Sequence, residues 1–97
     1  MVKESTFQHS LIKRIEKEFP GSYVFKNDPT YIQGFPDLTI LYKDKWAVLE
    51  CKRSSDSKKQ PNQDYYVEQL NGMSYSAFIN PDNEEEILDG LHKTFGA

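Results

Sequence analysis

The chain of 97 residues contains a single cysteine and no long apolar run. That cysteine, Cys51, excludes an internal disulfide and a cysteine-based zinc cluster, and it fits a protein of a reducing compartment. No stretch of about 18 apolar residues is present to cross a membrane, and the N-terminal MVKEST lacks the apolar segment of a signal peptide. We therefore expect a cytoplasmic protein with no membrane partner, and the length allows one domain, residues 1–97.

A strong positive charge is also lacking, because the formal net charge is −3 at pH 7. Taken alone, this value argues against a nucleic-acid partner. The charge is unevenly distributed, however. Residues 43–59 contain six Lys and Arg against three Asp and Glu, whereas residues 82–97 contain one Lys against five Asp and Glu. A basic middle beside an acidic tail permits one face that binds a polyanion, although mixed charge on a small domain usually serves solubility.

Apolar residues follow two kinds of spacing along the chain. Those between residues 4 and 19 recur with helical spacing, and a Pro-Gly pair ends that pattern. Short runs of aromatic and β-branched residues predict strands at 22–26, 38–42, 46–49 and 75–79. Further helices are expected at 61–71, with Gly72 as C-cap, and from residue 83 onward. The order is αβββαβα, an α/β (α+β) domain in which helices pack on a mixed sheet in one layer or two.

Three charged residues interrupt the most apolar stretch, GFPDLTILYKDKWAVLECKR. Asp37 opens the first of its two strands, and Glu50 and Lys52 share one face of the second because side chains alternate along a strand. A two-residue turn at 43–44 or at 44–45 sets Asp37 opposite Glu50 or opposite Lys52. Either register brings Asp37 to the face of Glu50, where directly opposed Cβ atoms lie ~5 Å apart.

Two carboxyl groups so close together repel one another unless a cation lies between them. Oxygen ligands favour a hard cation, so we expect Mg²⁺ or Mn²⁺ between Asp37 and Glu50, with the backbone carbonyl of Cys51 as a further ligand. Lys52 would then hold an attacking water beside a phosphate. The thiol of Cys51 faces the other way and is interpreted as a buried hydrophobe. The alternative is a surface ion pair between Glu50 and Lys52, the usual outcome for an isolated E-x-K.

GFPD at 34–37, followed by ECK at 50–52, resembles the PD-(D/E)xK nuclease superfamily, whose core has the order αβββαβ. Within it, the chain from residue 4 to about 80 is similar to the small VRR-NUC-like nucleases of phages, relatives of Holliday-junction resolvases. The resemblance implies that Gln63, in QPNQDYYVEQLN, is the glutamine of the helix after the motif, and that Glu4 is the acid of the first helix. It further implies a phage- or prophage-encoded enzyme that acts in a bacterial cell and leaves a 5′-phosphate and a 3′-hydroxyl.

The position of Glu4 also makes sense without the resemblance. It lies on the same helical stripe as the apolar residues Phe7, Leu11 and Ile15. It could instead be a first-turn acid favoured by the helix dipole. Glu18 lies near the same stripe but roughly 21 Å further along the helix, so only one of the two acids can serve the site. We expect Gln63 to orient the water or Lys52, or to contact the phosphate.

The polar loop SSDSKK contains Lys58 and Lys59, the best candidates for phosphate contacts, and Arg53 and Lys26 are further candidates. A solvated loop is the ordinary interpretation of such a run. The isolated His9 and His92 are expected at the surface. Trp46 and Val48 share the face of Glu50 and are expected to pack under the helix at 4–19.

These patterns predict a metal-dependent endonuclease acting on branched or structured DNA, because a domain of this size covers little duplex. A symmetric homodimer would match two strands with two sites. Candidates for its interface are the aromatic residues Phe25, Tyr31, Phe35 and Tyr42, unless they fill the core. The alternatives are a catalytically inactive nucleic-acid-binding or adaptor module on the same fold, and an RNase or restriction-type nuclease.

Overall fold

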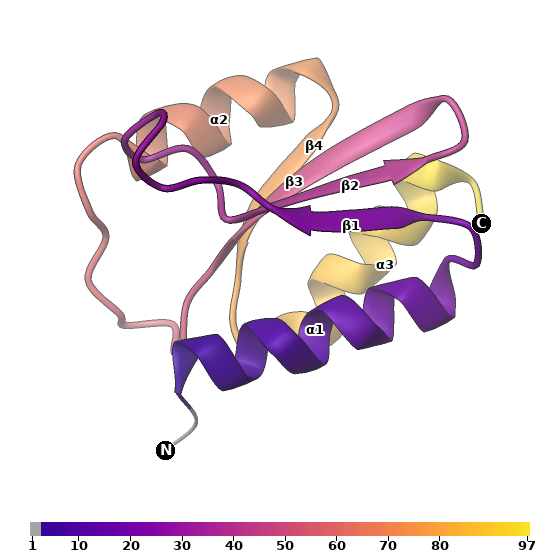
Figure 1. Ribbon diagram of the computed structural model, residues 1–97, viewed down its shortest axis with the longest axis horizontal. Helices are drawn as coiled ribbons and strands as arrows, with labels where there is room; N and C mark the ends of the chain where they lie inside the picture. The colour runs from indigo at the N-terminus through magenta and orange to yellow at the C-terminus, as the bar shows by residue number, and fades with distance from the viewer. Residues whose placement is uncertain (1–2) are drawn as a thin grey trace.

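The computed structural model describes residues 3–97, which form three helices and a four-stranded sheet (Figure 1). The elements are α1 (Glu4–Glu18), β1 (Tyr23–Lys26), β2 (Leu38–Tyr42), β3 (Lys45–Cys51), α2 (Gln63–Met73), β4 (Tyr75–Ile79) and α3 (Glu84–Phe95). The predicted α/β class, the order αβββαβα and the mixed sheet are confirmed. Within residues 3–97, no helix combines the length and the apolar character needed to cross a membrane.

The strand order in the sheet is β1-β2-β3-β4. The first three strands run antiparallel, whereas β4 runs parallel to β3, and α2 makes the crossover that a parallel pair requires. Tyr42 pairs with Lys45, so the hairpin turn consists of residues 43 and 44. Of the two predicted turns, this one extends the ladder past the pair Leu38–Leu49 and sets Asp37 opposite Glu50.

One face of the sheet is covered by α1 and α3, and the main core lies between the sheet and these two helices (Figure 1). Alternate residues of the two central strands point into this core because of the strand's period of two. They are Leu38, Ile40, Tyr42, Ala47, Leu49 and Cys51. The stripe of Phe7, Leu11 and Ile15 buries α1 against them, at about 1.5–3 kcal/mol for each large side chain removed from water.

The other face of the sheet is covered by α2, which packs on β3 and β4 (Figure 1). Trp46 and Val48 point to this face, and Val48 lies outside the core beneath α1. The prediction that these two residues pack under the first helix is therefore wrong. Alternation along a strand shows which residues share a face, but it does not show which helix will cover that face.

The bounds of α2 also differ from the prediction. The helix begins at Gln63, after Asn62 in the left-handed conformation (φ 71°), and it continues through Gly72 to Met73. Gly72 is thus not the C-cap, and the amide of Ser74 donates to the carbonyl of Leu70 at 3.0 Å instead. Packing of α2 on β4 outweighs the cost of about 1 kcal/mol for glycine inside a helix.

Candidate active site

Asp37 is half-buried where the loop after β1 enters β2, and its backbone and carboxylate are both held in place. Its carbonyl accepts a hydrogen bond from the amide of Asn27 at 2.7 Å. Its Oδ2 accepts one from the amide of Cys51 on β3 at 2.9 Å. Glu50 lies opposite on β3 and is only 2% exposed. The antiparallel register therefore places two carboxyl groups on one face, as predicted.

Gln63, from α2, bonds both to Glu50 of β3 and to Lys52, which directly follows that strand. Nε2 of Gln63 donates to Oε2 of Glu50 at 2.9 Å, and Oε1 of Gln63 accepts from Nζ of Lys52 at 2.8 Å. Lys52 and Gln63 are 7% and 8% exposed, so these polar groups satisfy one another out of water. Nζ of Lys52 lies 3.9 Å from Oε2 of Glu50, which is an ion-pair contact in a buried place. This burial contradicts a surface ion pair between Glu50 and Lys52.

The electrostatics of Glu50 oppose its charged form. Burial, and after it the negative charge of Asp37, raise the pKa of Glu50 well above its ordinary value, while Lys52 works in the opposite direction. Its Oε1 is buried and has no hydrogen-bond partner among the described residues. Buried polar atoms are rarely left unpaired, so this oxygen faces a position where a further group would bind.

Asp37 and Glu50 offer carboxyl oxygens as ligands, and Oε1 of Glu50 is unpaired. Such oxygens suit a hard divalent cation that keeps part of its water shell. Within residues 3–97, no group of three His, Cys, Asp or Glu side chains is already arranged as a metal site. The observed arrangement is a facing pair of acids, so a cation there would draw its other ligands from water, phosphate or backbone. The residues present fit Mg²⁺ or Mn²⁺ on this ground.

Glu4 lies at the N-terminal end of α1, near enough to Asp37 for the two charges to interact. Burial raises the pKa of Glu4, as does the charge of Asp37, whereas Lys52 and Arg53 lower it. Glu18, at the other end of α1, bonds to Arg14 and to His92 of α3 instead. The structure therefore places Glu4, rather than Glu18, on the side of the candidate active site.

Lys52 is held from two sides and still has a donor to offer. Its ammonium bonds to Oε1 of Gln63 and, at 3.2 Å, to the backbone carbonyl of Lys58. An ammonium group has three N–H donors, so these two bonds leave one for a bound water or phosphate. The loop carbonyl of Lys58 and the amide of Gln60, which donates to Oε1 of Gln63, are positioning groups that the sequence did not reveal. Backbone contacts of this kind have no side-chain signature.

The predicted basic contacts separate into different environments. Arg53 and Lys58 line a hollow of about 360 Å³ together with Lys3, Glu4 and Ser57, next to the acids. Lys59 pairs with Asp64 at 3.1 Å, and its ammonium lies 4.4 Å from the ring centre of Phe78. Lys26 is the exposed last residue of β1. Only Arg53 and Lys58 are thus brought together around the hollow beside Glu4.

The side chains of Cys51 and His92, which were given no role in the site, have defined environments. The thiol of Cys51 is buried in the core beneath α1, and burial raises its pKa above the ordinary value, as expected for an inert cysteine. His92 is not an isolated surface residue, because its Nε2 lies 2.8 Å from Oε1 of Glu18 and its ring contacts Phe19. His9 is exposed on α1, as predicted.

No protein-family model and no curated protein matches this sequence. Among solved structures, a chain described as a VRR_NUC domain protein has the same fold, with a TM-score of 0.72 over 97% of this chain and 91% of that chain. The two sequences are 20% identical. The relationship to VRR-NUC-like proteins, predicted from GFPD and ECK, is therefore confirmed at the level of the fold.

Proposed function

We propose that this protein is a divalent-metal-dependent endonuclease that hydrolyses phosphodiester bonds in DNA. The observation that supports it most is the buried cluster of Glu50, Lys52 and Gln63 beside the half-buried Asp37, in which one carboxyl oxygen of Glu50 is unpaired. Burying an acid and a lysine together, beside a second acid, is costly for a fold and gives it little stability in return. Such a cluster is more typical of a catalytic site. The shared fold with a VRR_NUC domain protein agrees with this function.

Asp37 and Glu50 would hold the cation, with Glu4 and the carbonyl of Cys51 as additional ligands. When bound, Mg²⁺ or Mn²⁺ would neutralise charge on the scissile phosphate and lower the pKa of a water molecule. The unpaired Oε1 of Glu50 is the atom best placed for this contact. The amide of Cys51 keeps the other acid, Asp37, in its orientation during binding.

Lys52 would direct the attacking water with its remaining N–H and offset the charge that develops on the phosphate. Gln63 keeps the ammonium in place and prevents it from collapsing onto Glu50. Water adds to phosphorus while the bond to the 3′ oxygen breaks, which leaves a 5′-phosphate and a 3′-hydroxyl. Arg53 and Lys58, beside the hollow next to Glu4, would hold a neighbouring phosphate.

Branched or structured DNA, such as a four-way junction, is the substrate class that we favour, with a homodimer that presents two sites. A surface for such an interface is available on the uncovered half of the sheet, where Tyr23, Phe25 and Leu41 are 72%, 45% and 41% exposed on one face. Exposed apolar side chains that share a face mark interaction surfaces. Tyr42, named beforehand as a candidate, is buried in the core and does not belong to this surface.

A panel of fluorescent substrates tests the function directly. Junction, flap, duplex, single-stranded and RNA substrates of matched sequence are incubated with the protein and Mg²⁺, Mn²⁺ or EDTA. We expect cleavage of branched DNA with either metal and none in EDTA. Binding without cleavage under every condition would favour the inactive binding or adaptor module, and cleavage of RNA alone would favour an RNase.

A further inference from the structure

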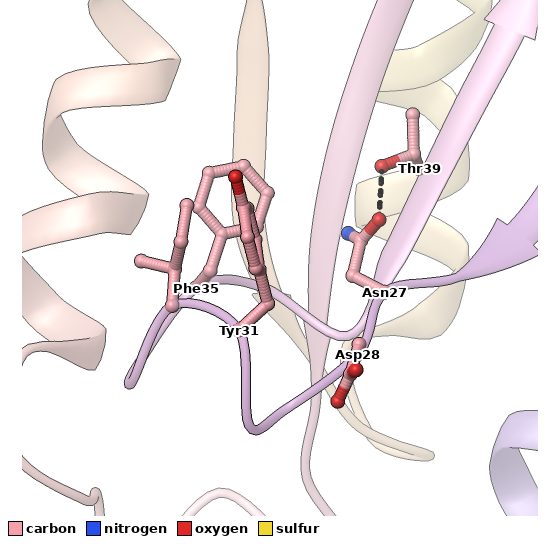
Figure 2. Close-up of a pocket in the computed structure, with 6 residues that line it drawn as sticks. Asn27, Asp28, Tyr31, Phe35 and Thr39 are labelled. Carbon is pink, nitrogen blue, oxygen red and sulfur yellow. Dashed lines mark hydrogen bonds between the residues drawn. The ribbon is translucent and has the colours of Figure 1, made fainter.

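A pocket of about 420 Å³ lies in a part of the fold that the proposed chemistry does not use. Its lining residues are Asn27, Asp28, Tyr31, Ile32, Phe35 and Thr39. Figure 2 shows the rings of Tyr31 and Phe35 on the loop side of the pocket, and Asn27 and Thr39 on the strand side. The pocket is therefore formed between the loop at 27–37 and the beginning of β2.

Two hydrogen bonds of Asn27 connect the wall of the pocket to the backbone just before Asp37. Thr39 on β2 follows Asp37, which directly precedes the strand, by two residues, a spacing of roughly 7 Å in extended backbone. Asn27 ties the wall to the site, because its side chain donates to the carbonyl of Pro36 at 2.8 Å and accepts from Thr39 at 2.9 Å. A ligand in the pocket would thus lie next to whatever Asp37 binds.

The chemistry of the lining selects a flat and uncharged ligand. Tyr31 is 84% exposed, so the fold gains little from its ring, which is available to stack. Asp28 carries a carboxylate at the pocket: hydrogen bonds from the side chain and the backbone of Thr30 lower its pKa. A carboxylate repels a phosphate, yet it accepts hydrogen bonds from N–H groups at the edge of an aromatic ligand.

The aromatic surface continues from the pocket onto α2. The ring of Phe35 lies 5.7 Å from that of Tyr66, which in turn lies 5.2 Å from the exposed Tyr65. Aromatic side chains in succession beside basic residues are the means by which proteins bind unpaired bases without sequence preference. Here Lys59 pairs with Asp64 in the first turn of α2, next to Tyr65.

We propose that this pocket holds one unpaired nucleobase of the substrate, stacked on Tyr31, directly beside the phosphate that the protein cleaves. The inference rests on the proposed function and narrows its substrate class. A fully paired duplex has no base to offer, whereas a junction, a flap or a single strand has one. The pocket would therefore select DNA in which a base next to the cleavage position is already unpaired.

Binding in EDTA isolates this step from cleavage. The probe is a 5′-fluorescein single-stranded DNA of about 16 nucleotides, the upper end of a single-strand site size. A set of the same strand carries one abasic site at each successive position. Fluorescence anisotropy gives the dissociation constant of each probe for the wild-type protein, Tyr31→Ala, Tyr31→Phe and the control Met73→Ala, which shortens an apolar side chain that is also mostly exposed but lies outside this pocket.

We expect Tyr31→Ala to weaken single-strand binding about 5- to 150-fold, the effect of losing one stacked base. Tyr31→Phe should bind like the wild type, because the ring and not the hydroxyl carries the contact. One abasic position should weaken binding to the wild type by a similar factor and have no effect on Tyr31→Ala. Duplex binding should be the same for both proteins.

Other outcomes would overturn the pocket assignment. If wild-type protein binds single strands but no abasic position differs between wild type and Tyr31→Ala, the pocket holds no base. If light scattering shows that Tyr31→Ala converts a dimer to a monomer, the pocket receives a second copy of the chain instead. A different result would mark failure of the proposed function alone. In that case the abasic effect on binding would persist in EDTA, but no substrate would be cleaved in Mg²⁺.

Discussion

At the scale of single residues, Gln63 is the side chain on which the geometry of the candidate active site depends. Its amide presents an oxygen to the ammonium of Lys52 and an N–H to the carboxyl group of Glu50, so each neighbour meets the group it requires. A glutamate at this position would add a charge against Glu50, and an apolar residue would leave both partners unpaired in a buried place. Glutamine is thus the side chain that satisfies both.

The role of Glu4 can be tested with a matched change on the same helix. We expect Glu4→Gln to slow DNA cleavage about 10- to 100-fold, the usual effect of losing a group that supports a metal site. Glu16→Gln should leave the rate unchanged, because Glu16 lies about 18 Å further along α1 than Glu4. Single-turnover cleavage of the best substrate measures both. Equal rates for the two variants would remove Glu4 from the site.

At the scale of elements, the loop at 27–37 is fitted closely against the start of α2. Gly34 has a φ of +87°, and a Cβ built there would lie 2.6 Å from Cβ of Asn62 and 2.6 Å from the carbonyl oxygen of Pro61. Only glycine allows this approach. The contact ties the segment that ends in Asp37 to the segment that begins with Gln63, so both sides of the site are held by one packing interaction.

Two glycine-to-alanine changes compare this contact with an open position. Gly34→Ala should destabilise the fold by about 1–3 kcal/mol, through its backbone conformation and the steric overlap, and should slow cleavage as the loop moves from α2. Gly72→Ala should stabilise it by about 0.5–1 kcal/mol, since Gly72 lies inside α2 with no atom within 4 Å of a built Cβ. Urea unfolding measures both. A neutral Gly34→Ala would show that the loop tolerates displacement.

Local patterns were sufficient to predict the hairpin and the candidate acids. The count of residues between Asp37 and Glu50 leaves an even turn, and alternation then puts Glu50 and Lys52 on one face. The sequence could not show that α2 covers this face, since the choice of helix depends on packing across the whole domain. It also did not reveal the pocket beneath Tyr31, because irregular loops have no periodicity to interpret.

At the scale of the whole molecule, a polar cluster joins the two helices that cover the core. Arg14 of α1 bonds to Glu18 and to Glu84 and Glu85 at the start of α3, while His92 near the end of α3 bonds back to Glu18. Apart from Arg14 and Glu18 on the same helix, these partners lie 70 to 74 residues apart in sequence, so no local pattern predicts their contact. Because the groups are partly exposed, we expect a modest contribution to stability.

The pair of Glu18 and His92 predicts a dependence of stability on pH. The hydrogen bond that the protonated His92 donates to Glu18 raises the pKa of His92 above its ordinary value of 6.5, so the folded protein holds that proton more tightly than the unfolded chain. The contribution is complete below about pH 6.5 and is lost as the pH rises through the raised pKa. His92 and Arg14, in that order, lower the pKa of Glu18, so the acid side of the contribution is lost only below about pH 4.5.

Urea unfolding of wild type and His92→Gln at several pH values measures this contribution. The difference in unfolding free energy should be largest near pH 6 and should shrink toward pH 9, about the range in which a histidine with a raised pKa loses its proton. His9→Gln, which removes an exposed histidine, serves as the control. A difference that stays constant with pH would mean that His92 contributes by packing on Phe19 alone.

Assembly is the second property of the whole molecule that can be measured. We expect a dimer of about twice the 11.3 kDa chain mass at micromolar concentration, and Phe25→Ser on the uncovered face should convert it to a monomer. Because Phe25 lies outside the core, this change should leave the unfolding free energy of the monomer nearly unchanged. Light scattering at several concentrations checks it. A monomer in the wild type, with and without DNA, would leave an enzyme that nicks one strand.

The central claim is that the buried cluster around Lys52 performs hydrolysis, and single-turnover cleavage by Lys52→Ala tests it most directly. Lys52→Met, which keeps the bulk of the side chain, and Lys45→Ala, which alters an exposed lysine at the other end of β3, are measured beside it. Anisotropy in EDTA reports DNA binding by the same proteins. If Lys52 acts in hydrolysis, both Lys52 variants should bind DNA like the wild type but cleave it at least ~10²-fold more slowly, while Lys45→Ala should cleave normally. Cleavage by a folded Lys52 variant at the wild-type rate would contradict this role.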